Sequence, residues 1–200
     1  MAPTTRPSAD EVVSETPTLE IRPAIAVHEP VGFATARGDE MGPEADRLRI
    51  AVADVRLEVF VGEQAVPFIQ EIDARDEEPT TIHLLARGAD GTPLGAGRIL
   101  MERAHPGRVH LGRLAVRRVA RGTGLGARVV VALEQAALSH SCRPCVEVVL
   151  SAQEQAMGFY ERCGYRVLNG RRYLDAGIWH QDMARTVSSV SAEKSSGSTA

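Results

Sequence analysis

The sequence is poor in lysine, aromatic residues and cysteine, and each shortage excludes a class of protein. Among 23 basic residues only one is a lysine, Lys194, so the folded region has no lysine for a Schiff base, for pyridoxal phosphate or for a GK[ST] phosphate loop. Aromatic residues make up 4% of the chain, too few for a platform that stacks single-stranded nucleic acid. The three cysteines are an odd number, which argues against a disulfide framework.

Long apolar runs are also missing. No stretch approaches the roughly 20 apolar residues that cross a membrane, and residues 1–17 contain acids and prolines where a secretory signal would be apolar. The net charge of −3 makes the whole chain a poor binder of polyanions. We therefore expect a cytoplasmic protein that binds neither a membrane nor nucleic acid.

Composition divides the chain into three parts. Residues 1–30 hold five of the 11 prolines and no glycine or aromatic residue, and residues 186–200 hold six serines. Both segments are predicted to be disordered tails, because they cannot bury enough apolar surface to offset chain entropy. The apolar content of 44% is sufficient for one core, so we expect a single folded domain over residues 31–185.

Hydrophobic periodicity predicts alternating strands and helices within this domain. Strands are expected at residues 31–37, 81–87, 93–101, 109–118, 145–152, 165–168 and 177–186. Helices are expected at residues 44–62, 124–139 and 153–164. This order is typical of the α/β (α+β) class, with helices flanking a mixed, mostly antiparallel central sheet.

The most informative segment is a glycine-rich turn between the strand ending near Val116 and the helix starting near Gly124. It reads Arg-Gly-Thr-Gly-Leu-Gly over residues 121–126. Glycines allow a sharp turn with unobstructed N–H groups, and a helix N-terminus attracts anions, so a pyrophosphate is the expected ligand. A turn without any ligand is the simplest alternative.

A dinucleotide-binding fingerprint is a second alternative for this turn, since Gly122, Gly124 and Ala127 satisfy the pattern G-x-G-x-x-G/A. That pattern requires a ribose-binding acid at the end of the next strand. The only acid of that strand, Glu147, lies in its middle, so a nucleotide-dependent oxidoreductase fits less well.

The turn and several other segments resemble the GCN5-related N-acetyltransferase (GNAT) superfamily, and within it the ElaA-like branch. Residues 121–126 are similar to the acetyl-CoA loop of that family, and residues 159–165 are similar to its FYxxxGF segment. Residues 59–67, 71–73, 150–153 and 177–180 resemble features of the ElaA-like branch. The sequence departs from the pattern at Gly62, where an acid is common, and at Tyr165, which replaces phenylalanine.

This resemblance implies a splayed sheet and an N-acetyltransferase that moves the acetyl group of acetyl-CoA directly to an amine, without a covalent intermediate or a metal. It implies that Tyr160 is the general acid that protonates the leaving thiolate. It assigns acetyl-CoA binding to Leu114, Ala115, Val116, Arg121, Gly122, Thr123, Gly124, Leu125, Gly126, Ala127 and Gln153. The acceptor would be a small molecule or a protein, and the enzyme a monomer or homodimer.

The sequence leaves the general base and the acceptor open. Candidate bases are Glu63, Glu71, Asp73, His83, His110 and Glu147. Residues 31–90 carry 13 acids and six bases, whereas residues 91–185 carry seven acids and 14 bases, which suggests that the acidic half binds the amine. A regulatory module that binds acetyl-CoA without catalysis is the alternative function. A single C-x-x-C at residues 142–145 is interpreted as a helix-to-strand loop, because no second ligand pair for zinc accompanies it.

Overall fold

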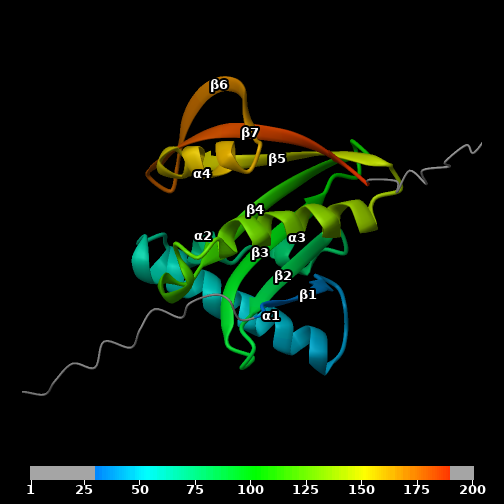
Figure 1. Ribbon diagram of the computed structural model, residues 1–200, viewed down its shortest axis with the longest axis vertical. Helices are drawn as coiled ribbons and strands as arrows, with labels where there is room; N and C mark the ends of the chain where they lie inside the picture. Colours follow the sequence, from blue (N-terminus) through cyan, green and yellow to red (C-terminus); the bar gives the residue numbers. More distant parts are fainter. Residues whose placement is uncertain (1–29, 190–200) are drawn as a thin grey trace, which may run out of the picture.

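The computed structural model describes residues 30–189, in which a seven-stranded sheet carries helices on both faces (Figure 1). The predicted tails, 1–30 and 186–200, lie outside the described residues apart from Pro30 and residues 186–189. The strands are β1 Gly32–Arg37, β2 Thr81–Arg87, β3 Pro93–Met101, β4 Arg108–Val116, β5 Cys145–Gln153, β6 Arg166–Asp175 and β7 Ile178–Ser188. The α-helices are α1 Pro43–Arg56, α2 Phe68–Glu71, α3 Leu125–His140 and α4 Met157–Arg162.

The sheet is divided in its middle. Its strand order is β1-β2-β3-β4-β5-β7-β6, and within residues 30–189 every neighbouring pair is antiparallel except β4 and β5. That parallel pair is joined only where Arg108–His110 face Glu147–Val149, and the two strands then diverge (Figure 1). The prediction of a mixed, mostly antiparallel sheet flanked by helices is confirmed.

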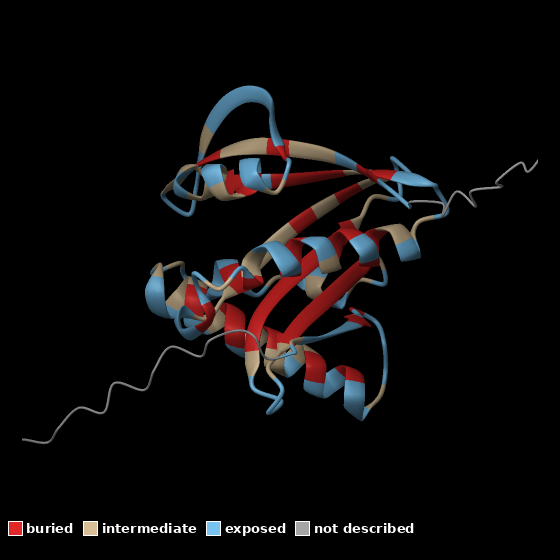
Figure 2. Cartoon of the chain, viewed as in Figure 1, coloured by how far each residue is buried: buried red, intermediate tan, exposed pale blue. Residues whose placement is uncertain are grey.

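Helices α1 and α3 cover opposite faces of the larger half of the sheet. Leu84 packs in the cluster beneath α3, whereas its neighbour Leu85 packs in the cluster beneath α1, because successive strand residues point to opposite faces. Both leucines are almost fully buried, and each such burial contributes roughly 2 kcal/mol relative to exposure. Figure 2 shows the buried residues concentrated on these central strands, while β6 at the far edge is mostly exposed.

Three predicted elements differ in detail from the structure. The helix predicted at 44–62 ends at Arg56 and continues as a π-helical segment, Leu57–Glu63. The loop that follows contains α2 and a 3₁₀ turn at Ala74–Glu77. The helix predicted at 153–164 is divided into a 3₁₀ turn at Glu154–Ala156 and α4, and the strand predicted at 165–168 extends as far as Asp175.

A β-bulge interrupts the regular pairing of β3 with β4. Ala96 of β3 faces Ala115, but Arg98 faces Gly112, so one residue of β3 opposes two residues of β4. Arg113 lies at this bulge with φ of 53°, a conformation that side chains other than glycine rarely adopt. The bulge therefore re-aims the end of β4, as bulges near functional sites commonly do.

One close backbone contact yields a stability prediction. A Cβ on Gly38, which follows β1, would lie 2.4 Å from the carbonyl oxygen of Glu78 and 2.6 Å from that of Asp76. We expect Gly38→Ala to lower the free energy of unfolding by about 2 kcal/mol or more, a fall in melting temperature of roughly 4–8 °C. Gly32→Ala is the control, because nothing lies within 4 Å of a Cβ at Gly32. Equal melting temperatures for the two variants would contradict this packing.

Candidate active site

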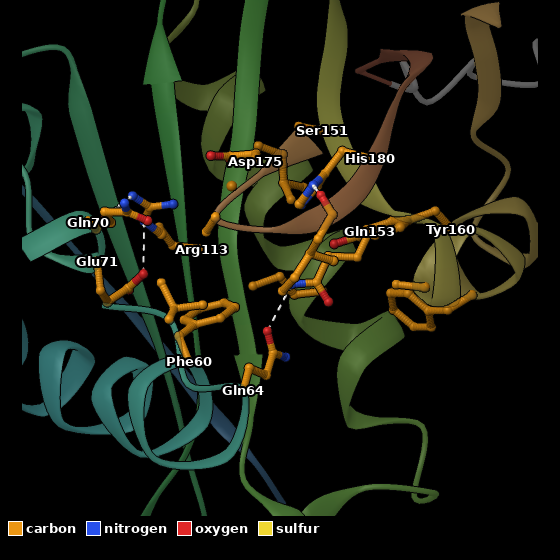
Figure 3. Close-up of a pocket in the computed structure, with 18 residues that line it drawn as sticks. Phe60, Gln64, Gln70, Glu71, Arg113, Ser151, Gln153, Tyr160, Asp175 and His180 are labelled. Atoms are coloured by element: carbon orange, nitrogen blue, oxygen red, sulfur yellow. Dashed lines mark hydrogen bonds and ion pairs between the residues drawn. The ribbon is translucent and has the colours of Figure 1, made fainter. Parts of the chain in front are cut away.

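A cavity of about 300 Å³ opens where β4 and β5 separate (Figure 3). Strand β4 contributes residues 111–114 to its wall, and β5 contributes Ser151 and Gln153. Other lining residues come from the π-helical segment and the following loop, from α2, from α4, and from the β6–β7 hairpin. These include Phe60, Gln64, Gln70, Glu71, Tyr160, Asp175 and His180.

Two glutamine amides join the two sides of the cavity. Gln153 donates a hydrogen bond of 2.8 Å from Nε2 to Oε1 of Gln64, and its own Oε1 accepts one of 2.9 Å from Gln155 (Figure 3). The structure thus places Gln153, a predicted contact of acetyl-CoA, in the cavity wall with a fixed amide orientation.

The glycine-rich turn has the open backbone that its sequence predicts. Gly122 and Gly124 have φ of 77° and 83°, and no atom lies within 4 Å of a Cβ built on either. A Cβ on Gly126 would instead lie 3.3 Å from the ring of Phe159, so this glycine lets α4 pack closely against α3. Side chains at the first two positions would be strained by the backbone conformation itself.

Helix α3 begins directly after this turn, and its first N–H groups have no acceptors within the helix. A helix leaves its first N–H groups without helical acceptors, and Gly124 provides no side-chain cap. The Thr123 hydroxyl donates to the Ala120 carbonyl at 2.6 Å and accepts only a long hydrogen bond of 3.4 Å from the N–H of Leu125. Together with the positive end of the helix dipole, these N–H groups fit a phosphate or diphosphate.

Arg121 is held by an ion pair with Glu63 at the end of the π-helical segment. Its two terminal nitrogens donate to the Glu63 carboxylate at 2.8 and 3.1 Å, and its Nε donates to the Val116 carbonyl at 2.9 Å. The hydrogen bond from Arg121, with the charges of Arg121 and Arg118, lowers the pKa of Glu63. Glu63 is therefore a weak proton acceptor.

The end of β4 has one paired edge and one open edge. Ala115 and Val116 pair with Ala96 and Gly95 of β3, whereas the pairing of β4 with β5 stops at His110. The predicted contact residues Leu114, Ala115 and Val116 thus lie on a strand whose second edge borders the gap. Backbone groups on such an edge can pair with an added extended chain.

Tyr160 projects from α4 into the cavity wall. It is 8% exposed, and its ring makes edge contacts with Phe159 and Tyr165 at centroid distances of 5.0 and 5.9 Å. Burial raises the pKa of Tyr160, so the phenol keeps its proton at neutral pH. None of the described residues is hydrogen-bonded to its hydroxyl.

The structure separates the six candidate bases, because only Glu71 lines the cavity. Glu71 is 1% exposed and is paired with Arg56 at 2.5 Å and Arg113 at 3.2 Å. Burial raises the pKa of Glu71 despite these cations. The other five lie outside the cavity wall and contact other partners; they are Glu63, Asp73, His83, His110 and Glu147.

Glu71 belongs to a charge cluster of three acids and three arginines. Its members are Arg56, Arg98, Arg113, Glu71, Asp73 and Asp76. The charges balance within the cluster, so each of these three carboxylates is already paired with an arginine. Breaking such a buried pair is costly because it leaves a charge without its partner.

The cavity also contains polar residues that sequence reasoning did not assign. Asp175 directly precedes a tight hairpin turn in which Ala176 and Gly177 both have positive φ, 48° and 77°, and His180 follows this turn in β7. Ser151 lies on the neighbouring strand β5 (Figure 3). The signal available in the sequence was segment 177–180, which resembles the ElaA-like branch but carries no role from spacing alone.

Three further features of the described residues bear on earlier expectations. None of the helices within residues 30–189 combines the length and apolarity of a membrane span. Over the same range no three His, Cys, Asp or Glu residues are grouped as metal ligands. Cys142 and Cys145 are exposed, and Cys163 is partly buried.

Comparison with known proteins finds relatives that cover most of the described chain. Residues 48–187 match the family model described as "Acetyltransferase (GNAT) domain". The chain is 40% identical over 131 residues to the uncharacterized N-acetyltransferase YjcF of Bacillus subtilis, which covers 66% of this chain and 87% of that protein.

Solved structures give the same result. An acyl-CoA N-acyltransferase from Pseudomonas aeruginosa matches with a TM-score of 0.64 and 31% identity, covering 78% of this chain and 99% of that chain. ElaA from Escherichia coli matches with a TM-score of 0.65 and 26% identity, again covering 78% of this chain and 99% of the other.

The charge cluster predicts a pH-dependent stability. Burial opposes ionisation of Asp76, but the hydrogen bonds and charges of Arg56 and Arg98 outweigh it and lower the pKa of Asp76 from 3.8 to about 2. The ionised carboxylate therefore favours the folded state by about 2 kcal/mol at neutral pH. That contribution is complete above about pH 4 and is lost as the pH falls toward 2.

We expect Asp76→Asn to lower the free energy of unfolding by at least this amount at pH 7, and the difference from wild type to shrink between pH 4 and 2. Denaturant titrations at several pH values measure both effects. Asp39→Asn is the control, because Asp39 pairs with Arg37 at the surface, where ion pairs contribute roughly 0–1 kcal/mol. A pH-independent difference for Asp76→Asn would contradict the assignment.

Proposed function

Since the chain belongs to the GNAT acetyltransferase family, whose members transfer acyl groups, we propose that it moves the acetyl group of acetyl-CoA to an amine of a small molecule or protein. The observation that carries this proposal is the junction of three features. An unobstructed glycine turn opens α3, the adjacent β4 has a free edge, and the cavity beside that edge contains Tyr160.

The residues present fit the parts of coenzyme A. The N–H groups of Gly122, Gly124, Leu125, Gly126 and Ala127 suit its diphosphate, with Thr123 and Arg121 bordering the same turn. The free edge at Leu114, Ala115 and Val116 suits the amide-containing pantetheine arm, which can pair with it as an added strand would. Gln153 lies across the gap from this edge and is an additional polar contact.

Acetyl-CoA, when bound, supplies a thioester carbonyl that an amine can attack. On the protein side, N–H groups near Leu114 and Val116 are suited to stabilise negative charge on a carbonyl oxygen. The Tyr160 hydroxyl retains a proton, which a departing thiolate can accept. Apolar residues of the cavity wall, Phe60 and Leu111 among them, lie beside these groups.

A module that binds acetyl-CoA without catalysis is the alternative, and it would require the same glycine turn but no acceptor cavity. The polar residues that line the cavity beside Tyr160 favour catalysis. Consumption of acetyl-CoA over a panel of polyamines, amino sugars and peptides distinguishes the two, because a binding module would show affinity without turnover.

Binding is tested by thermal shift. At 100 times its dissociation constant acetyl-CoA should stabilise the fold by about 2.7 kcal/mol, which raises the melting temperature by roughly 5–10 °C. Gly124→Val should abolish most of this shift, because a β-branched residue disfavours φ of 83° and obstructs the donors.

Gly170→Val is the matched control for this experiment. Gly170 also has positive φ, 71°, with open space around its Cβ, but it lies in β6 at the far edge of the sheet. It should cost similar stability and leave the shift by acetyl-CoA intact. An undiminished shift in Gly124→Val would exclude the turn from binding.

Catalysis is tested at Tyr160. We expect Tyr160→Phe to lower kcat at least about tenfold while leaving acetyl-CoA affinity almost unchanged, because it removes a proton donor and keeps the packed ring. Steady-state kinetics and calorimetry measure the two quantities. Unchanged kcat would remove Tyr160 from the mechanism.

A further inference from the structure

His180 occupies the side of the cavity formed by the smaller half of the sheet. It lies in β7, where it faces Gln153 of β5 on one side and Tyr173 of β6 on the other. It is 8% exposed and lines the cavity near Ser151 and Asp175 (Figure 3). A buried histidine that borders a cavity can exchange a proton with whatever molecule the cavity holds.

The hydrogen bond of His180 determines which ring nitrogen faces that molecule. Its Nδ1 lies 2.9 Å from the carbonyl oxygen of Ile178. A carbonyl oxygen only accepts, so Nδ1 must carry the hydrogen, and in the neutral ring Nε2 holds the free lone pair. None of the described residues is hydrogen-bonded to Nε2, which therefore remains available as a proton acceptor.

A set of side chains keeps the imidazole in this orientation. The Tyr173 ring is stacked on it, with centroids 6.1 Å apart and an interplanar angle of 18°. The Tyr173 hydroxyl donates to the Asp182 carboxylate at 2.6 Å, which leaves the Ser151 hydroxyl to donate to the Tyr173 oxygen at 2.6 Å. Tyr173 is thus fixed at both its ring and its hydroxyl.

The other titratable groups that face this part of the cavity are less suited to accept a proton. Both oxygens of Glu71 contact arginines, Arg56 and Arg113. The phenols of Tyr160 and Tyr173 keep their protons, since burial raises the pKa of each. Asp175 also lines the cavity and is exposed to solvent. It is therefore the main alternative to His180 as the proton acceptor.

We propose that His180 Nε2 is the base that takes a proton from the ammonium group of the acceptor. The N–H bonding pair stays on the amine nitrogen as the nucleophilic lone pair, the proton moves to Nε2, directly or through one water, and it later leaves to solvent. The inference rests on the proposed function and adds that the acceptor arrives as a protonated primary amine.

The test uses His180→Asn, since the asparagine amide can still donate to the Ile178 carbonyl but offers no base at the Nε2 position. With the primary amine that the panel shows to be the best acceptor, kcat/KM at pH 7 should fall at least about 100-fold. The affinity for acetyl-CoA should be unchanged by calorimetry. Asp175→Asn is the matched control and should lose less than about fivefold.

Two further measurements separate a catalytic role from a structural one. The pH profile of kcat/KM should differ between wild type and His180→Asn, because the variant has no ionisable group at this position. Added imidazole should restore activity to His180→Ala, because the shorter alanine side chain leaves space for the imidazole molecule. In the protein without substrate, ¹⁵N NMR of the neutral ring should show hydrogen on Nδ1 and not on Nε2.

The outcomes distinguish this inference from the proposed function. If wild type acetylates an amine and His180→Asn retains full activity, or if Asp175→Asn carries the larger loss, His180 is not the base and the function stands. Hydrogen on Nε2 in the NMR spectrum would overturn the assignment even if the variants failed to fold. If wild type acetylates no amine in the panel, the proposed function and the role of His180 both fall.

Discussion

The separation of β4 from β5 is the constraint on which the rest of the structure depends. Three residue pairs join the strands, from Arg108 to His110 on β4, before they diverge. Had the pairing continued, the backbone groups on this edge of β4 would be hydrogen-bonded to β5 and could not bind anything else. The gap instead brings together an unpaired strand edge, the start of α3 and a cavity, although these features come from distant parts of the sequence.

The two halves of the sheet contribute different chemistry to that gap. The larger half supplies backbone donors, at β4 and at the glycine turn, which suit the phosphates and amides of a coenzyme. The smaller half and the adjoining helix α4 supply side chains, including His180 and Tyr160. Backbone donors are fixed by the fold itself, whereas side chains need support from their neighbours. Tyr173 provides that support for His180, and its own hydroxyl is hydrogen-bonded to Ser151 and Asp182.

The charge cluster stabilises the wall of the cavity at a cost. Arg56 and Glu71 are almost completely buried, so desolvation offsets much of their attraction. The cluster instead fixes the positions of the elements around it. Arg113, in its strained conformation at the bulge, is held by Glu71 and Asp73, and the loop that follows α2 is tied to β3 through Arg98.

Local patterns allowed much of the fold to be predicted, but not its convergent features. Strands β2 and β3 match the predicted ranges because apolar residues and turn residues mark their bounds. The π-helical segment was not predicted, because Leu48, Val52, Val55 and Val59 repeat with the spacing of an uninterrupted α-helix. The glycine turn could be predicted because its residues are contiguous in the sequence. The contact between Gln64 and Gln153 joins residues 89 positions apart, and no single-sequence pattern reports such a pair.

The tight turn at Ala176 and Gly177 makes the length of the β6–β7 hairpin as constraining as any of its side chains. Strand residues alternate between faces, so inserting or deleting one residue there would rotate β7 by half a turn relative to β6. His180 and Asp182 would then point to the opposite face of the sheet with their chemistry intact and their geometry lost. Homologues are thus expected to vary the identity of the turn residues more freely than their number.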